Sequence, residues 1–177
     1  DEAGVSHFLE HLCFKGTARW PTSQEVSEAI EGVGGIFNGG TDKEVTIYWC
    51  KVAQSHFRLA LDVLADLVRR PKLDPGDMEK ERPVIIEEIN MCWDSPQMRV
   101  DTLEDELMWP GQYLGRDIAG SKESVTGLTH RMVSDYLLQR YLPNSTVLSI
   151  AGNIDQALVE ESVLEVFSDW APGKSPP

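Results

Sequence analysis

The chain has 177 residues, a length typical of about one domain, and its 41% hydrophobic and 25% charged residues exclude a disordered tail, a collagen-like fibre and a coiled coil. Its net charge of −13 argues against nucleic acid as the main partner, because phosphate binding requires clustered Lys and Arg. No apolar run approaches the roughly 18 residues of a membrane span, so none is predicted.

The three cysteines, Cys13, Cys50 and Cys92, are far apart and form no CxxC pair. This spacing indicates neither a disulfide framework nor a zinc ribbon, and it is typical of buried, reduced thiols. Free thiols favour a reducing compartment such as the bacterial cytoplasm or the mitochondrial matrix, although the sequence leaves the compartment open.

The first part of the chain alternates helical and extended patterns. Apolar residues recur at helical spacing over residues 4–15, and Thr22 followed by Glu25 predicts the capped start of a second helix that ends at Gly34. Residues 36–41 and 45–52 are β-branched and aromatic and flank a short polar turn, which predicts a strand, a turn and a strand.

The rest of the chain is mainly helical. We predict helices over residues 55–70, 74–92, 97–108, 125–141 and 158–170, a glycine-bearing loop over 113–121 and a strand over 145–151. Pro83 interrupts the 74–92 helix and should kink it. Helices outnumber strands, so the fold class is α+β, with too few strands for a doubly wound sheet.

The most specific motif is His7-Phe8-Leu9-Glu10-His11. On a helix His7 and His11 lie one turn apart on the same side, where two imidazoles can bind one metal ion. Glu10 lies on that side too, so its carboxylate can reach a metal-bound water without being a ligand. The alternative is three polar residues on a solvated face, but Phe8 and Leu9 indicate a partly buried helix. His56 and His130 are isolated and are interpreted as ordinary surface or cap residues.

A zinc site needs a third protein ligand, and the acidic helix over 74–92 offers one. Glu88 projects from an apolar stripe formed by residues three and four positions away on either side, where an unpaired carboxylate would be costly. Glu81 lies two turns earlier on nearly the same side, so it is predicted to support a ligand from behind. Glu87 faces solvent in this helix.

Residues 7–17, His-Phe-Leu-Glu-His-Leu-Cys-Phe-Lys-Gly-Thr, resemble the inverted zinc motif of the pitrilysin/insulinase family, which includes mitochondrial processing peptidase and bacterial processing proteases. The resemblance covers nearly the whole chain and includes the spacing from His11 to Glu88, the supporting Glu81 and the 115–120 loop. It implies a zinc endopeptidase domain of the α/β-roll type, with an antiparallel-rich sheet packed by helices. It also implies that Phe37, Asn38, Gly39 and Gly40 form the edge strand on which a peptide substrate adds as a further strand; as an alternative, Asn38 is a turn residue.

The resemblance further implies the domain organisation. Residues 1–171 would form the zinc-binding domain, incomplete at its N-terminal strands, and residues 172–177 would begin a linker to a homologous second domain or subunit. The expected function is hydrolysis of peptides or unfolded polypeptides with one zinc ion, held by His7, His11 and Glu88, and with Glu10 as general base. The alternative is a non-catalytic metal-binding or partner-binding part of a processing peptidase complex.

Overall fold

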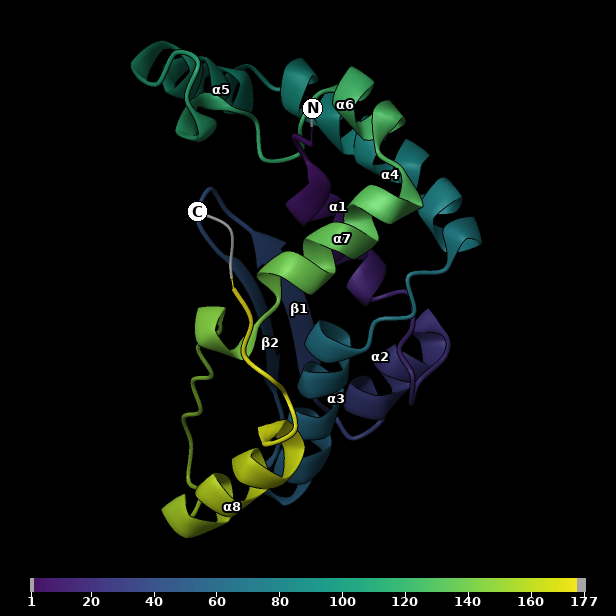
Figure 1. Ribbon diagram of the computed structural model, residues 1–177, viewed down its shortest axis with the longest axis vertical. Coiled ribbons are helices and arrows are strands. Elements are labelled where there is room, and N and C mark those ends of the chain that lie inside the picture. The colour runs from purple at the N-terminus through teal and green to yellow at the C-terminus, as the bar shows by residue number, and fades with distance from the viewer. Residues whose placement is uncertain (1, 175–177) are drawn as a thin grey trace. The chain divides into compact units, whose positions relative to one another are not determined.

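The computed structural model describes residues 2–174 (Figure 1). The described helices and strands follow in chain order: α1 (Val5–Cys13), α2 (Ser23–Glu31), β1 (Ile36–Thr41), β2 (Thr46–Lys51), η1 (Gln54–His56), α3 (Phe57–Arg69), α4 (Pro75–Asp94), α5 (Pro96–Met108), η2 (Tyr113–Gly115), α6 (Lys122–Gly127), α7 (His130–Arg140), η3 (Pro143–Ser145) and α8 (Gln156–Phe167). This content confirms the α+β class. Among the described helices, none combines the length and the apolar character needed to cross a membrane.

The chain divides into two compact units, each built from separate stretches of sequence. The first unit contains Asp1–Leu12, Gly40–Ile47 and Leu73–Ser134. The second unit contains Cys13–Gly39, Tyr48–Lys72 and Asp135–Pro177. The motif helix and the acidic helix both belong to the first unit.

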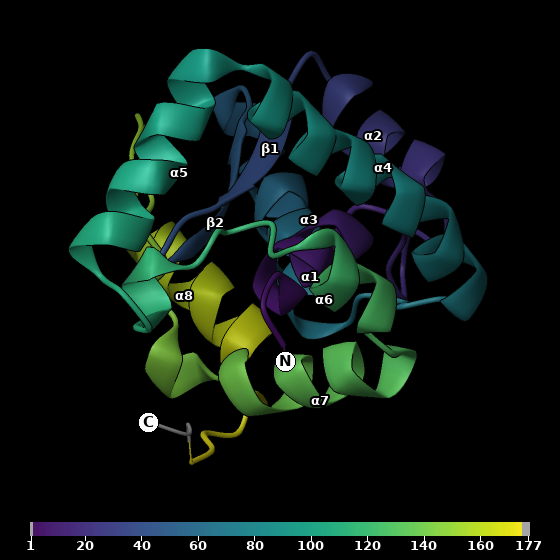
Figure 2. The same cartoon turned by 90° about the horizontal axis from the view of Figure 1, so that it is seen from above.

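In the first unit, α4 begins at a well-formed cap and carries the acidic residues. The Asp74 side chain accepts hydrogen bonds from the Gly76 and Asp77 amides, and Pro75 occupies the first turn, where its missing N–H costs nothing. The helix then runs as one element through Pro83 to Asp94. It lies beside α6, as Figures 1 and 2 show.

The start of α1 is fixed by close backbone packing in the first unit. Gly4 has a φ of +88°, and a Cβ there would stand 2.4 Å from the carbonyl oxygen of Ala119. Glycine is therefore required at this position, both for its conformation and for its contact. The contact holds the first turn of α1 against the 119–120 loop, whose Gly120 also has a positive φ.

In the second unit, α2 and α3 pack around one apolar cluster. Its buried members are Val26, Ile30, Ala60, Val63 and Leu67, and Phe37 and Cys50 from the strands pack against it. The predicted capping box of Thr22 and Glu25 is confirmed at the start of α2. Helix α8 joins α3 through Arg69, whose Nη2 donates to Asp169 at 2.7 Å.

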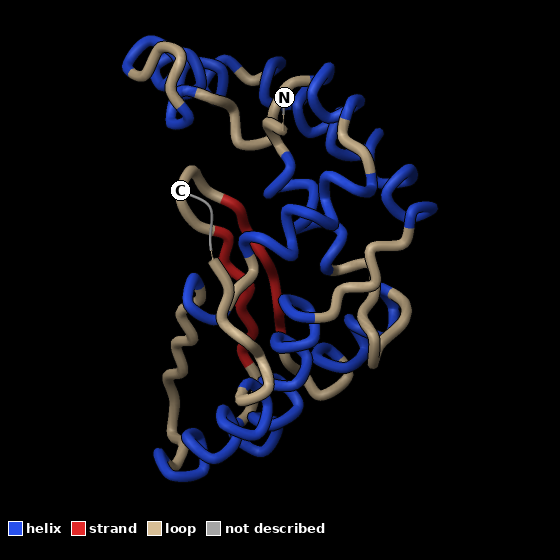
Figure 3. The backbone as a smooth tube through the Cα atoms, viewed as in Figure 1, coloured by secondary structure: helices blue, strands red, loops and turns tan. Residues whose placement is uncertain are grey.

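Strands β1 and β2 form a two-stranded antiparallel hairpin, drawn red in Figure 3. The turn between them is closed by the Asp42 amide, which donates to the carbonyl of Val45 at 2.8 Å. Side chains alternate along both strands, so that Ile36, Ile47 and Trp49 are exposed. The predicted hairpin is confirmed.

Two predicted elements are wrong. The helix predicted over 125–141 is two helices, α6 and α7, because Leu128 has an extended backbone and the Thr129 hydroxyl accepts from the Met132 amide at the start of α7. The strand predicted over 145–151 is an exposed stretch that belongs to no sheet of residues 2–174 (Figure 3). Its β-prone residues are locally suited to a strand, but a strand also requires a partner. Residues 175–177 of the predicted linker lie outside the described residues.

Candidate metal centre

The two histidines of the motif converge on one point. They project from successive turns of α1, their rings meet edge to face with centroids 4.5 Å apart, and their Nε2 atoms are 3.1 Å apart. The apolar neighbours Phe8, Leu9 and Leu12 are fully buried and fix the orientation of the helix. As a result, both imidazoles present the same ring nitrogen to the same small space.

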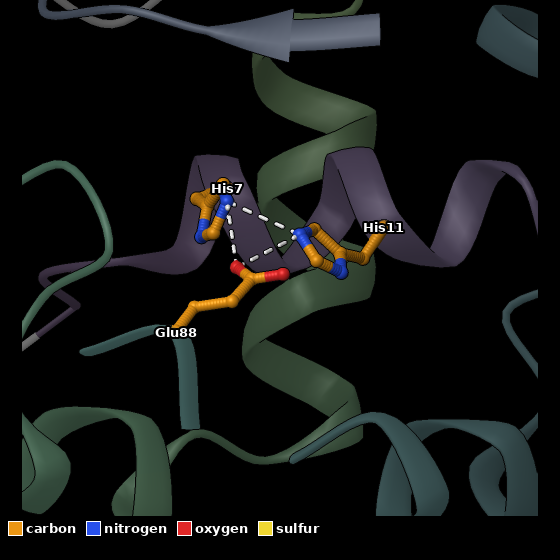
Figure 4. Close-up of side chains that lie close together, drawn as sticks. All are labelled: His7, His11 and Glu88. Carbon is orange, nitrogen blue, oxygen red and sulfur yellow. Dashed lines mark hydrogen bonds and ion pairs between the residues drawn. The ribbon is translucent and has the colours of Figure 1, made fainter. Parts of the chain in front are cut away.

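Glu88 of α4 brings a carboxylate oxygen to that space, as Figure 4 shows. Its Oε2 lies 3.6 Å from His7 Nε2 and 3.5 Å from His11 Nε2. Donor atoms bound to one tetrahedral zinc ion at about 2.0–2.1 Å stand roughly 3.4 Å from each other. The three donors therefore have the spacing of a zinc ligand set, and the Glu88 side chain is 37% exposed.

Glu81 lies behind His11. Its Oε1 is 2.9 Å from His11 Nδ1, and the residue is buried. A carboxylate at this distance accepts the Nδ1 proton, which leaves the Nε2 lone pair directed at His7 and Glu88. Burial of the His11 ring opposes its protonation, but the hydrogen bond to Glu81 and the nearby carboxylates outweigh it, so the His11 pKa is raised.

His7 has a different environment from His11. Its Nδ1 is buried and has no hydrogen-bond partner among the described residues. Burial, and then the charge of His11, lower the His7 pKa to about 4. At neutral pH His7 is therefore uncharged, which is the state in which an imidazole binds a metal.

Glu10 lies beside the three candidate ligands without joining them. The group of residues whose donor atoms could share one ion contains His7, His11 and Glu88 but not Glu10. Glu10 is 8% exposed, and its Oε2 lies 3.5 Å from the hydroxyl of Thr41. Burial raises the Glu10 pKa more than the neighbouring His11 and the Thr41 hydroxyl lower it. A buried carboxylate with a raised pKa has the character of a general base.

The predicted substrate-binding residues lie on β1. Phe37 packs against the core of the second unit, and its ring centroid lies 5.5 Å from that of Phe14. Phe37 is therefore part of the packing around that core. The Asn38 side chain accepts a hydrogen bond from the Gly39 amide, and a Cβ at Gly40 would meet only open space. Their role toward a substrate stays a prediction.

Sequence reasoning missed Thr41 and Lys43. In the first unit, Thr41 lies near Glu10, and Lys43 lies at the hairpin turn. The signal was weak, because a threonine at the end of a strand is common and its partner is 31 residues away in sequence. The Nε2 atom of the isolated His130 lies 2.7 Å from the carbonyl oxygen of Leu73. A carbonyl oxygen only accepts, so the ring nitrogen donates and His130 has a structural contact.

Comparison with known proteins gives consistent matches. Residues 1–122 match the family described as insulinase, peptidase family M16. The uncharacterized zinc protease YmxG of Bacillus subtilis is 36% identical over 172 residues, 97% of this chain and 42% of that protein. The beta subunit of the mitochondrial-processing peptidase of Dictyostelium discoideum is 32% identical over 174 residues, 94% of this chain and 35% of that subunit.

Solved structures show the same fold. A protease from Helicobacter pylori superposes with a TM-score of 0.91 at 20% identity, covering 99% of this chain and 42% of that one. Pitrilysin superposes with a TM-score of 0.85 at 23% identity, covering 98% of this chain and 19% of that one. The chain thus spans about two fifths or less of the proteins it matches. The match over residues 1–122 and the likeness to curated zinc proteases show that the chain belongs to the insulinase family, peptidase family M16.

Proposed function

We propose that this chain carries the zinc-binding centre and the general base of a peptidase that hydrolyses peptide bonds. The observation that supports this most directly is the convergence of His7 Nε2, His11 Nε2 and Glu88 Oε2 within 4.8 Å of one another. Curated relatives that are named zinc proteases support zinc as the ion. Two imidazoles and one carboxylate, with an open fourth position, are a common ligand set of catalytic zinc.

The residues have separate tasks in this proposal. His7, His11 and Glu88 hold one zinc ion, and Glu81 fixes the tautomer and the orientation of His11. The chemistry that a zinc ion would supply when held there is polarisation of the scissile carbonyl and a lower pKa for a water molecule.

Glu10 is the proposed general base. Its carboxylate takes a proton from the attacking water and delivers it to the leaving amine. Burial suits it to both steps, because a raised pKa brings a carboxyl group closer to the pH at which it must gain and lose a proton.

We further propose that residues 1–171 act together with a homologous second domain or subunit, and that the substrate is a peptide or an unfolded polypeptide. The chain spans 42% of YmxG and 42% of the Helicobacter pylori protease, so these relatives contain much more chain than this one. The same coverage favours a second candidate, in which the chain is a metal-binding part of a larger complex and has no activity by itself.

The test is Glu10→Gln in the full-length protein that contains this chain. We expect zinc content to stay near one ion per chain and peptide hydrolysis to fall at least about 100-fold, since only the proton acceptor is lost. Zinc content is measured by elemental analysis, and turnover is measured with an unstructured peptide. Glu87→Gln, an exposed change on α4, is the matched control and should keep full activity.

Hydrolysis at the parental rate by Glu10→Gln would show that the assigned base is wrong. A full-length parent that binds zinc but hydrolyses no peptide favours the second candidate.

A further inference from the structure

Thr41 is the last residue of β1 and contacts the buried carboxylate of Glu10. Its Oγ1 donates a hydrogen bond to Glu10 Oε2 at 3.5 Å. Within residues 2–174, this hydroxyl is the one hydrogen-bond donor that the chain supplies to the Glu10 side chain, and it reaches only one of the two oxygens. Oε1 is therefore left without a donor from the described chain.

The hydroxyl is held in place by its surroundings. Thr41 is β-branched and paired in the hairpin, so its side-chain torsion is restricted. Two residues later, Lys43 Nζ binds Asp105 Oδ2 at 2.9 Å and the carbonyl of Arg116 at 2.6 Å. These contacts anchor the turn that follows Thr41 to α5 and to the segment after η2, all within the first unit.

The consequence for Glu10 follows from the hydrogen-bond geometry. A buried carboxylate without a donor can rotate about its last torsion, which is soft. A donor on Oε2 limits this rotation and stabilises the negative charge on that oxygen, so Oε1 remains the oxygen that is free to accept a proton. If Thr41 served only to form the strand, removing its hydroxyl would not affect Glu10. The tendency to form a strand depends on the shape of the side chain and not on the hydroxyl.

We propose that Thr41 is a positioning residue that orients Glu10 for proton transfer through its hydroxyl group. The proposal rests on the proposed role of Glu10 as the base. It assigns Thr41 no contact with the metal and no contact with the substrate.

The experiment compares Thr41→Val with Thr41→Ser in the full-length protein. Valine keeps the shape and the β-branch and removes the hydroxyl, whereas serine keeps the hydroxyl and removes the methyl group. We expect Thr41→Val to lower kcat about 10- to 100-fold, a part of what a general base contributes. KM should stay within about twofold, because binding in the ground state is unchanged. Thr41→Ser should retain kcat to within about threefold.

The matched control is Thr46→Val on β2, which removes a threonine hydroxyl from the partner strand and should leave kcat unchanged. Zinc content should stay near one ion per chain in all three variants. The proposal is overturned if Thr41→Val keeps the parental kcat, if Thr41→Ser is as slow as Thr41→Val, or if Thr41→Val loses zinc. A parental rate in Glu10→Gln overturns the proposed base, whereas an inactive Glu10→Gln beside a fully active Thr41→Val overturns only the role of Thr41.

Discussion

At the scale of single residues, the two imidazoles of the site are unequal. His11 has a carboxylate behind its Nδ1, at 2.9 Å, whereas the Nδ1 of His7 is buried without a partner among residues 2–174. A carboxylate behind a ligand imidazole fixes its tautomer and makes its other nitrogen a better donor. We therefore expect Glu81 to strengthen one of the two proposed nitrogen ligands.

The first prediction tests this expectation. Glu81→Gln should weaken zinc binding at pH 7 by about tenfold, because the amide lacks the charge that makes His11 a strong donor. Glu88→Gln should weaken it more, because a charged ligand is lost. Competition with a zinc chelator gives both affinities, and the exposed Glu87→Gln is the control. Equal affinities for Glu81→Gln and the parent protein would contradict the role of Glu81.

At the scale of elements, Arg82 joins three helices of the first unit. Its guanidinium donates to the carbonyls of Val125, Thr126 and Leu128 at the end of α6, and it lies 5.5 Å from the ring centre of Phe8 on α1. Cations at the C-terminal end of a helix complete the hydrogen bonding of its last carbonyls. Because Arg82 follows Glu81 directly, the same turn of α4 binds α6 and supports His11.

The second prediction concerns the stability given by this arginine. Arg82→Met keeps an apolar stem against Phe8 but leaves the three carbonyls without their donor. The free energy of unfolding should fall by about 1–3 kcal/mol, as expected when partly buried hydrogen bonds to a charged group are lost. Urea denaturation measures the change, with the exposed Lys80→Met as the control. A midpoint for Arg82→Met equal to that of Lys80→Met would show that these contacts contribute little.

Asp66 has a similar role in the second unit, where it joins α3 to the segment after α1. The carboxylate is fully buried, binds Arg70 Nε at 2.5 Å and accepts a hydrogen bond from the Arg19 amide at 2.9 Å. Burial raises the Asp66 pKa, but the hydrogen bonds from Thr17, Arg19 and Arg70 and the charge of Arg70 outweigh it. The net result is an Asp66 pKa below its ordinary value.

The third prediction is the pH dependence that follows. A carboxyl group with a lowered pKa in the folded state stabilises the fold fully above the ordinary Asp pKa of about 3.9. That contribution is lost as the pH falls through the lowered pKa. Asp66→Asn should therefore be less stable than the parent chain at pH 7, and the difference should shrink below about pH 4. Urea midpoints at pH 7, 5 and 3.5 measure it, and a constant difference would contradict the assignment.

At the scale of the whole molecule, the parts of the site that the sequence could predict are those that depend on local periodicity. The spacing of His7 and His11 on one helix places their rings together whatever the rest of the chain does. Glu88 could be identified because its own helix puts apolar residues around it, so a carboxylate there needs a partner. The contact of Thr41 with Glu10 could not be predicted, since it depends on where the hairpin turn is anchored.

The errors have the same physical origin. The helical pattern over 125–141 did not show that Thr129 caps a new helix, because capping depends on the backbone of the residues around it. The run over 145–151 has strand-forming residues, but pairing is a property of two segments and cannot be seen in one. Both errors therefore concern segments whose conformation depends on contacts that the local pattern does not contain.

The three proposed zinc ligands come from two helices, with His7 and Glu88 separated by 81 residues of chain. A metal ion bound by all three would act as a removable cross-link that closes this long loop. By chain-entropy estimates for covalent cross-links, closing a loop of this length lowers the conformational entropy of the unfolded chain, which is worth about 4.5 kcal/mol of stability. Because a metal that binds only the folded chain stabilises it, the metal-free chain would open more readily and would be cleaved faster by proteases.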